Sequence, residues 1–358
     1  MSCSAPEEPD APKDQPVSIR AVDASFYPEM VDAGITYSDS SGVASLPVLL
    51  KRHGFNMVRL RVWNQPATTR SSPNEVLEAA ATFYKAGLGI WIDFHYSDTW
   101  ADPGHQTPPA AWSGLSAEVL ADSVYAFTRR FLEQLRDRGV VPGVIQTGNE
   151  ISGGMLWPAG LVNSVDTTQW RSLSRLLNAG LQACNTVFPT ARRMIHIADP
   201  GSGFWFFGYL NHYLTDYDLV GVSWYPWWHG KDLSWLTIQL TQLNRITGKP
   251  VIIAETAYPW TLGWNDWTNN IVGNSSQCVP GFPPDPAGQQ ALMRRIASLA
   301  RSVNQEPVHG WCYWAPEHLA AYGPQSTHGS PWENLTLFDF TGKALPAFYE
   351  VGRPTSVD

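Results

Sequence analysis

Short apolar runs alternate with longer segments of helical periodicity along nearly the whole chain. The apolar runs predict β-strands at residues 19–24, 57–62, 89–94, 141–147, 193–197, 219–223, 250–254 and 310–314. Most of these runs are dominated by apolar residues, which is typical of a parallel sheet whose two faces are both covered. A polar or aromatic segment follows each run, so each predicted strand delivers polar groups at its carboxyl end.

Helical patterns separate the strands, at residues 43–53, 74–86, 117–138, 168–188, 204–214, 232–247 and 286–304, with a closing segment near 346–351. Their ends carry the expected signals, because Pro73 and Ser116 stand at helix starts and Gly87 and Gly248 follow helix ends. Eight strand-and-helix units without a break in composition predict one (β/α)8 barrel, a TIM barrel, across residues 17–358. A doubly wound sheet is the alternative, although no Gly-x-Gly-x-x-Gly follows the first strand.

The amino-acid composition argues against some classes of binding partner and favours others. The 358 residues carry 24 Lys and Arg against 32 Asp and Glu, a net charge of -8, which argues against nucleic acid. No apolar stretch approaches the roughly 18 residues of a membrane span. The 17 Trp residues exceed what a core of this size needs, so we expect some of them to line a cleft for sugar rings or other flat apolar surfaces.

The first residues differ in composition from the rest of the chain. Residues 1–16 are polar and Pro-rich, and they predict a disordered tether. Cys3 precedes this tether, as the lipidated cysteine of a bacterial surface lipoprotein does; the alternative is a chance cysteine at the start of the chain. The chain has four cysteines without metal-type spacing, which argues against a disulfide framework.

Two glutamates terminate apolar strands. Glu150 follows the fourth predicted strand, and Glu255 follows the seventh. In (β/α)8 barrels the active site forms at the carboxyl ends of the strands, and two carboxylates about 5 to 5.5 Å apart are the arrangement of a retaining glycosidase. The alternative for Glu150 is a structural ion pair with an arginine, because ion-pair networks also bring carboxylates into barrels.

Other strand ends deliver further charged side chains. Arg59 and Arg61 lie two residues apart on the second predicted strand and therefore point to the same face. If that face is the barrel interior, each must be paired with a carboxylate such as Asp93 or one of the two glutamates. His95 follows the third strand as either a core histidine or a site residue, and its polar surroundings favour the site.

Long motifs at these strand ends carry a resemblance to a known family. They include Ser-Phe-Tyr-Pro-Glu-Met at 25–30, Val-Arg-Leu-Arg-Val-Trp-Asn at 58–64 and Gly-Asn-Glu at 148–150, with others at 93–105, 155–158, 195–199, 225–230, 255–260 and 332–334. With these motifs the chain resembles glycoside hydrolase family 53, the endo-β-1,4-galactanases, within the large clan of (β/α)8 retaining glycosidases. The resemblance covers residues 19–347.

The resemblance implies roles for the matching residues. Glu150 would be the acid/base, Glu255 the nucleophile, and Asn149 would bind the sugar 2-hydroxyl at the cleavage site. Further residues would surround the cleavage site or contact the substrate: Arg59, His95, Tyr225, Trp314, Asp98, Trp100, Asp199, Trp227, Trp228 and His229.

The chain departs from the family at a calcium site. Some bacterial members hold a structural calcium between the last two loops with an Asp-x-Asp-x-His-x-Asn run, whereas this chain has Asn-Asp-Trp-Thr-Asn-Asn at 265–270. Asp266 and Asn270 still offer oxygen ligands of the kind that calcium accepts. The alternative is a loop closed by side-chain hydrogen bonds.

By this resemblance we expect a secreted or surface-anchored hydrolase that cuts β-1,4-linked galactan, the type I arabinogalactan side chains of pectin, internally and with retention. No cofactor would be needed for the chemistry. Two alternatives stay open. One is a related barrel glycosidase acting on mannan or glucan, and the other is a carbohydrate-binding protein without activity, which the presence of both strand-end glutamates and Asn149 disfavours.

Overall fold

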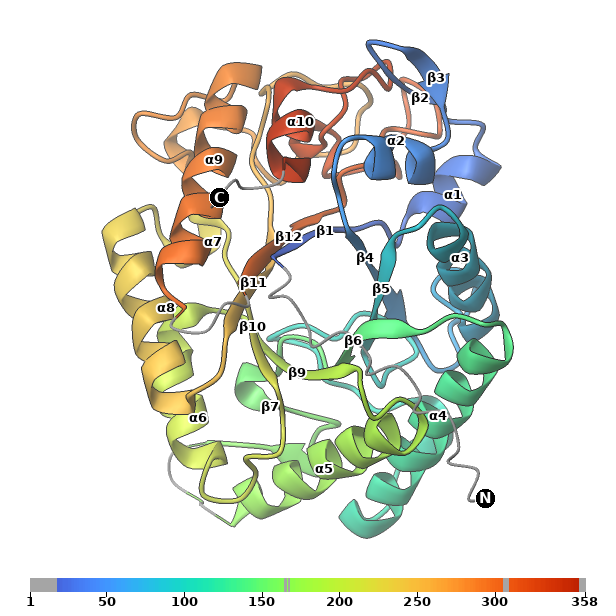
Figure 1. Cartoon of the computed structure of the whole chain (residues 1–358), viewed down its shortest axis with the longest axis vertical. Helices are drawn as coiled ribbons and strands as arrows, with labels where there is room; N and C mark the ends of the chain where they lie inside the picture. Colours follow the sequence, from blue (N-terminus) through green and yellow to red (C-terminus); the bar gives the residue numbers. More distant parts are fainter. Residues whose placement is uncertain (1–17, 164–165, 167, 305–308, 354–358) are drawn as a thin grey trace, which may run out of the picture.

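Eight parallel strands close into a barrel, and helices surround it (Figure 1). The computed structural model describes residues 18–163, 166, 168–304 and 309–353. The first strand pairs with both the second and the last strand of the barrel, which closes the sheet and rules out the doubly wound alternative. The tether predicted at residues 1–16, with Cys3, lies outside the described residues.

The barrel strands agree with the predicted ones to within two residues at each end. In ring order they are β1 (Ile19–Asp23), β4 (Met57–Val62), β5 (Gly89–Phe94), β6 (Pro142–Thr147), β9 (Arg192–Ile197), β10 (Leu219–Ser223), β11 (Val251–Thr256) and β12 (Gly310–Trp314). The seventh of these strands is longer than predicted at its carboxyl end, so Glu255 lies within β11 rather than after it.

The predicted helices are present with small shifts at their ends. They are α2 (Leu46–Arg52), α3 (Pro73–Lys85), α4 (Ala117–Asp137), α5 (Gln169–Val187), α6 (Gly203–Leu210), α8 (Leu233–Thr247), α9 (Pro286–Ser302) and α10 (Pro346–Gly352). Ser116 caps α4 by accepting a hydrogen bond from the Val119 N–H at 3.4 Å. Gly248 ends α8 in left-handed backbone, with φ of 64°.

The helix predicted at residues 43–53 begins too early. Val43 belongs instead to β3 (Gly42–Ala44), which forms a hairpin with β2 (Tyr37–Asp39). Ser45 has extended backbone, with ψ of 148°, and the helix begins only after it. Short elements that the pattern did not predict lie in the loops: α1 (Tyr27–Asp32), α7 (Pro226–His229), β7 (Gly154–Met155), β8 (Gly160–Leu161), η1 (Ala110–Trp112), η2 (Ile151–Gly153), η3 (Pro200–Ser202), η4 (Ser275–Gln277) and η5 (Glu333–Leu335).

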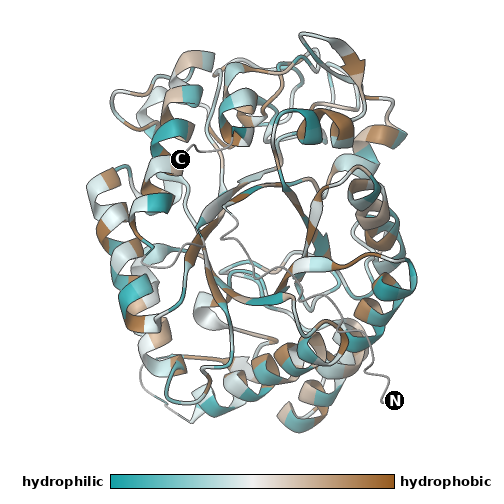
Figure 2. Ribbon diagram, viewed as in Figure 1, coloured by the Kyte–Doolittle hydropathy of each residue, from teal (hydrophilic) through white to brown (hydrophobic). Residues whose placement is uncertain are grey.

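The barrel interior changes from apolar to polar along the strands, and Figure 2 shows both kinds of residue on the barrel ribbons. The apolar part is a closed cluster of Ile19, Ala21, Met57, Trp91, Val144, Met194, Leu219, Ile252, Ala254 and Cys312. Nearer the carboxyl ends, every second residue is again inward but polar. Asp23, Arg59, Asp93, Gln146 and His196 form this buried polar layer. The barrel therefore presents polar side chains at the end where sites form in this fold.

Cys184, Cys278 and Cys312 are buried free thiols. Within the described residues, no helix combines the length and apolar character that crossing a membrane requires.

Tyr313 on β12 joins the strand to the surrounding loops. Its buried hydroxyl donates to the Leu335 carbonyl at 2.6 Å and lies 3.1 Å from both the Tyr258 N–H and the Gln289 side-chain amide, which donate to it. The Tyr313 hydroxyl thus forms hydrogen bonds with polar groups from three other segments at the carboxyl end of the barrel.

We predict that Tyr313→Phe lowers the free energy of unfolding by about 1 to 3 kcal/mol, because buried donors lose their acceptor. Urea unfolding followed by tryptophan fluorescence measures the change. Tyr84→Phe, at an exposed tyrosine on α3, is the matched control and should leave the midpoint in place. Equal midpoints for the two variants would contradict the assigned role of the Tyr313 hydroxyl.

Candidate active site

The guanidinium of Arg59 lies at the centre of the polar layer and is almost completely buried. Its Nη1 contacts Asp23 Oδ2 and Glu255 Oε1, both at 2.8 Å. Its Nη2 donates to Asn149 Oδ1 at 2.7 Å and pairs with Asp93 Oδ2 at 2.8 Å. Burial lowers the pKa of Arg59, but the carboxylates outweigh burial and raise this pKa well above its ordinary value. The expected pairing of Arg59 with carboxylates is confirmed.

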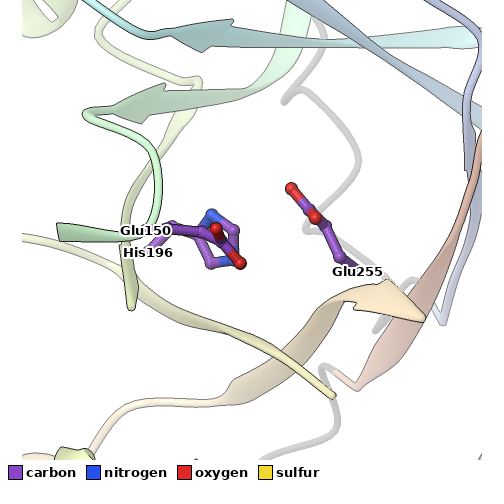
Figure 3. A group of neighbouring side chains, drawn as sticks. All are labelled: Glu150, His196 and Glu255. Atoms are coloured by element: carbon purple, nitrogen blue, oxygen red, sulfur yellow. The ribbon is translucent and has the colours of Figure 1, made fainter. Parts of the chain in front are cut away.

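Glu150 and Glu255 face each other across the barrel mouth, with His196 beside Glu150 (Figure 3). A carboxylate oxygen of each glutamate and a ring nitrogen of His196 all lie within 4.8 Å of one another. Glu150 follows β6 after Gly148, and both have left-handed backbone, with φ of 82° at Gly148 and 50° at Glu150. This conformation costs a non-glycine residue on the order of 1 to 3 kcal/mol and is concentrated at functional sites.

Glu255 reaches the same space from an irregular part of β11. The pairing register of β11 shifts against both β10 and β12 near this residue, and such bulges re-aim side chains. Both carboxylate oxygens of Glu255 accept hydrogen bonds, Oε1 from Arg59 at 2.8 Å and Oε2 from the Tyr225 hydroxyl at 3.0 Å. These donors favour the ionised form of Glu255.

The two glutamates have different electrostatic surroundings. Burial and the neighbouring charge of Glu255 raise the pKa of Glu150 well above its ordinary value. Burial also raises the pKa of Glu255, to about 7, while Arg59 acts in the opposite direction. Among the described residues, no lysine or arginine lies within ion-pair distance of Glu150, whereas Arg59 pairs with Glu255. Burial therefore favours the protonated form of both glutamates, and only Glu255 has a cationic partner that favours its ionised form.

Aromatic rings line the pocket into which the glutamates open, a cavity of about 470 Å³. Trp100 and Trp228 are 38% and 56% exposed, while Trp314 and Trp332 are buried in its wall with ring centroids 4.4 Å apart. Indole faces in a pocket that also holds carboxylates suit the apolar faces of sugar rings. Most residues that the resemblance assigned to the site line this pocket: Arg59, His95, Trp100, Asn149, Glu150, Tyr225, Trp228, Glu255 and Trp314.

Four of the expected substrate contacts do not line the pocket. Asp98 accepts hydrogen bonds from two backbone N–H groups at 2.8 Å each, and Asp199 caps η3. Nδ1 of His229 accepts from the Tyr225 N–H at 3.0 Å, and Trp227 packs on the Tyr225 ring with centroids 5.2 Å apart. These side chains stabilise the loops that present the pocket residues. A short carboxylate side chain readily bonds to backbone a few residues along the chain, which accounts for Asp199, whereas the donors to Asp98 are the distant Gln65 and Ala110.

His95 lines the pocket and is tied on both sides of its ring. Its Nε2 lies 3.0 Å from Asp93 Oδ2, and its Nδ1 accepts from the Ala101 N–H at 3.1 Å. Burial lowers the pKa of His95, so the ring is neutral near pH 7 and donates from Nε2 to Asp93. The histidine thereby connects the polar layer to the loop that carries Trp100.

The prediction that Arg61 is paired with a carboxylate is wrong for the part of the chain that the structure describes. Its Nε donates to Ser71 Oγ at 2.9 Å, and its buried Nη1 has no hydrogen-bond partner among these residues. The guanidinium instead stacks on aromatic rings, 4.1 Å from the centroid of Trp100, 4.7 Å from Phe26 and 5.1 Å from Trp63. Cation–π contacts of this kind stabilise a desolvated cation.

Gln146, Ser223 and His318 belong to the site or its surroundings without having been predicted there from the sequence. Gln146 donates to Asp93 Oδ1 at 2.6 Å, and its inward place in the period of two along β6 was a usable signal. Ser223 ends β10, and its Oγ lies 3.0 Å from Nε2 of His196. His318 lines the pocket but follows no strand directly, and no local pattern distinguishes it.

The carboxylate pair and His196 are spaced closely enough for a metal ion, but other groups already use their atoms. The two ring nitrogens of His196 lie 3.0 Å from Ser223 Oγ and 2.9 Å from Asn149 Oδ1. Arg59 and Tyr225 occupy both carboxylate oxygens on the β11 side. A cation there would have to displace Arg59, so this group does not fit a resident metal.

The loop predicted to offer calcium ligands does fit a calcium ion. Asp266 Oδ2, Asn270 Oδ1 and Glu333 Oε2 are buried oxygen atoms without a hydrogen-bond partner among the described residues. Burial and the nearby charge of Asp266 raise the pKa of Glu333, and the Asn270 side chain lies beside the Glu333 carboxylate. Carboxylate and amide oxygens are the ligands that calcium prefers. Glu333 is an addition to the predicted pair of Asp266 and Asn270.

Comparisons with known proteins agree with this geometry. The sequence model of glycosyl hydrolase family 53 matches residues 19–350. The arabinogalactan endo-β-1,4-galactanase of Cellvibrio japonicus is 33% identical over 341 residues, which cover 91% of this chain and 88% of that protein.

Solved structures give the same result. The family 53 catalytic domain of Ignisphaera aggregans superposes with a TM-score of 0.85 at 33% identity, covering 94% of this chain and 95% of that one. A structure from a study of two fungal β-1,4-galactanases superposes with a TM-score of 0.80 at 31% identity, covering 94% and 99% of the two chains. The chain belongs to glycosyl hydrolase family 53.

Proposed function

We propose that this protein is an endo-β-1,4-galactanase that hydrolyses galactan by double displacement with retention. The observation that carries the proposal is the carboxylate pair, in which one oxygen of Glu150 and one oxygen of Glu255 lie within 4.8 Å of each other. That spacing suits a retaining glycosidase, in which the carboxyl groups are about 5 to 5.5 Å apart, and is too short for the roughly 6.5 to 9.5 Å of an inverting one. The galactan specificity rests on the relatives named galactanases.

In the first step a carboxylate oxygen of Glu255 attacks the anomeric carbon, and the bond from that carbon to the leaving oxygen breaks. Glu150 gives its proton to the leaving oxygen, so the product is a free sugar hydroxyl and Glu150 becomes ionised. The electrostatic asymmetry of the pair supports this assignment, since burial keeps the proton on Glu150 and Arg59 favours the ionised Glu255.

In the second step water attacks the anomeric carbon of the glycosyl-enzyme. The ionised Glu150 accepts a proton from that water, and the Glu255 carboxylate leaves. Both glutamates return to their starting protonation states. Each step uses only carboxyl groups and water, so the proposed mechanism requires no cofactor.

Neighbouring side chains assist the substrate in this scheme. Asn149 lies in the pocket lining with one amide N–H bonded to the Ala101 carbonyl at 2.8 Å, which leaves its second N–H for the sugar 2-hydroxyl. Trp100 and Trp228 offer exposed ring faces for stacking on further sugar units. The substrate is a plant-wall polymer of the arabinogalactan type, which is too large to enter a cell, so we expect the enzyme to act outside it.

We predict that the enzyme depolymerises purified β-1,4-galactan and releases oligosaccharides whose new reducing ends are first β anomers. A ¹H NMR time course reports the linkage cut, the endo mode and the anomeric outcome together. Mannan and cellulose are the matched substrates for the alternative polymer specificities. Turnover of mannan or cellulose in preference to galactan would contradict the proposed substrate, and binding of galactan without turnover would indicate a carbohydrate-binding protein.

We predict that Glu150→Gln and Glu255→Gln each reduce turnover of galactan by at least about 10²-fold, because one removes the transferable proton and the other the nucleophile. A galactoside with a good aryl leaving group separates the two roles. Glu150→Gln should retain far more of its activity on this substrate, since the leaving group departs without protonation. Glu133→Gln on the outer face of α4 is the control. Galactan turnover within severalfold of the parent enzyme would refute the mechanism.

Structural calcium at Asp266, Asn270 and Glu333 is a second part of the proposal, supported by their three buried oxygen atoms. An ion that binds the folded state alone raises its stability, so EDTA should lower the midpoint of thermal unfolding by roughly 5 °C and added Ca²⁺ should restore it. Asp266→Asn should remove this response, while Asp122→Asn on exposed α4 should keep it. A midpoint that EDTA leaves unchanged would favour a loop closed by hydrogen bonds.

A further inference from the structure

The ring of Trp100 lies in the loop after β5, lines the catalytic pocket and is 38% exposed. Two other tryptophans contact it at large angles. The ring of Trp63 lies 5.4 Å away at 79°, and that of Trp314 lies 6.1 Å away at 50°. Neither ring is parallel to the indole of Trp100, so a flat contact on its face must come from another group.

The guanidinium of Arg61 supplies that contact. Its Cζ lies over the Trp100 ring, 4.1 Å from the centroid. A carbon atom beside the edge of an indole would be farther from the centroid, because the radius of the ring adds to a van der Waals distance of about 3.5 to 4.0 Å. Arg61 therefore covers one face of Trp100, and the exposed part of the ring belongs to its other face and outer edge.

Arg61 is itself held in place from two loops. Its backbone N–H donates to Ser25 Oγ at 2.9 Å, and its Nε donates to Ser71 Oγ at 2.9 Å. The Ser71 carbonyl in turn accepts a hydrogen bond from the Trp63 N–H at 2.9 Å. Arg61 is only 3% exposed, so hydrogen bonds and packing together fix the position of its guanidinium.

The same guanidinium connects Trp100 to other parts of the pocket wall. It lies 4.7 Å from the ring centroid of Phe26, and the Phe26 ring stacks on His318 with centroids 3.7 Å apart and an angle of 8°. Phe26 follows β1 and His318 follows β12, and both line the pocket. Trp100 is thus part of a row of planar groups that joins three segments of the barrel mouth.

The positive charge of Arg61 is costly in this place. Its buried Nη1 has no hydrogen-bond partner among the described residues, and no carboxylate of that part of the chain lies within ion-pair distance. An apolar side chain could fill the same volume without the cost of desolvating a cation. Such a group calls for a compensating role, and the geometry offers the flat contact with Trp100.

We propose that Arg61 is a positioning residue that fixes the plane of Trp100, so that the opposite face of the indole is ready to receive a galactosyl ring. This inference rests on the proposed function for the identity of the sugar. A ring that is already held in its bound orientation loses less conformational freedom when the substrate binds. The planar shape of the guanidinium is essential, because a lysine offers the charge without a flat group to stack on the indole.

The first test measures the affinity for galactotetraose by calorimetry, with Glu150→Gln in every variant so that turnover does not interfere. Arg61→Lys keeps the charge but loses the plane and the Nε donor. We expect it to weaken binding about 3- to 10-fold, the effect of having to immobilise one side chain on binding. Arg130→Lys, at an exposed arginine of α4, is the matched control and should leave the affinity unchanged. Full affinity in Arg61→Lys overturns the proposal.

A double-mutant cycle with Trp100→Ala separates positioning of the indole from a general disturbance of the pocket. In the Trp100→Ala background Arg61→Lys has no indole left to release, so the further loss of affinity should be less than about 2-fold. Losses that multiply in full would show that Arg61 acts elsewhere in the pocket, and they would overturn the proposal. If Arg61→Lys does not fold, Arg61→Met, which keeps the length without the charge, takes its place in the cycle.

A measurement without sugar tests the positioning itself. In protein labelled with ¹⁵N-tryptophan, the indole N–H resonance of Trp100, identified by its absence in Trp100→Phe, should have the heteronuclear NOE of a rigid ring. Arg61→Lys should lower this NOE, and an unchanged value overturns the proposal. A parent enzyme that neither binds nor cleaves galactan would refute the proposed function, whereas the NOE would still decide whether Arg61 holds the ring.

Discussion

The guanidinium of Arg59 is the cation on which the polar layer of the barrel depends. Three carboxylates lie around it, from Asp23, Asp93 and Glu255, and each is nearly or fully buried. A buried carboxylate without a partner is costly, and so is a buried arginine, but together they compensate one another. Removing the cation would leave like charges facing each other in a region of low dielectric. The interior of the barrel can therefore be ionic at one end only because this one side chain reaches its centre.

The two strand-end glutamates differ because the backbone delivers them differently to that centre. Glu255 arrives from a bulged strand and meets Arg59 and Tyr225 directly. Glu150 arrives after a left-handed turn at Gly148 and meets no arginine or lysine within ion-pair distance among the described residues. Burial raises the pKa of both side chains, but only Glu255 has an arginine that favours its ionised form, and the proposed double displacement needs such a difference.

The second arginine of β4 shows that a buried cation has more than one means of compensation. Arg61 lies two residues from Arg59 on the same strand, yet aromatic rings of Phe26, Trp63 and Trp100 surround it in place of carboxylates. The guanidinium is planar and weakly hydrated, so stacking costs it less than it would cost a lysine. The partly exposed ring of Trp100 therefore packs against the guanidinium of Arg61.

Local pattern alone determined the architecture and the pair of glutamates. Strand and helix positions follow from hydrophobic periodicity, which is a property of neighbouring residues, and the strand ends follow from them. Once the barrel is inferred, Glu150 and Glu255 must meet at one end of it, since the carboxyl ends of all parallel strands lie there. The family motifs added roles to residues whose positions the pattern had already predicted.

Only the tertiary structure decided which partner each polar side chain takes. Arg61 stacks on rings from other loops, the carboxylate of Asp98 bonds to backbone rather than lining the pocket, and Glu333 joins Asp266 from 67 positions along the chain. The two ring nitrogens of His196 take their partners from other segments, the Asn149 amide after β6 and the Ser223 hydroxyl on β10. Such contacts join residues far apart in sequence, and their energies depend on distances of a few tenths of an ångström. Periodicity carries no information about those distances, because it records only which face of an element a residue occupies.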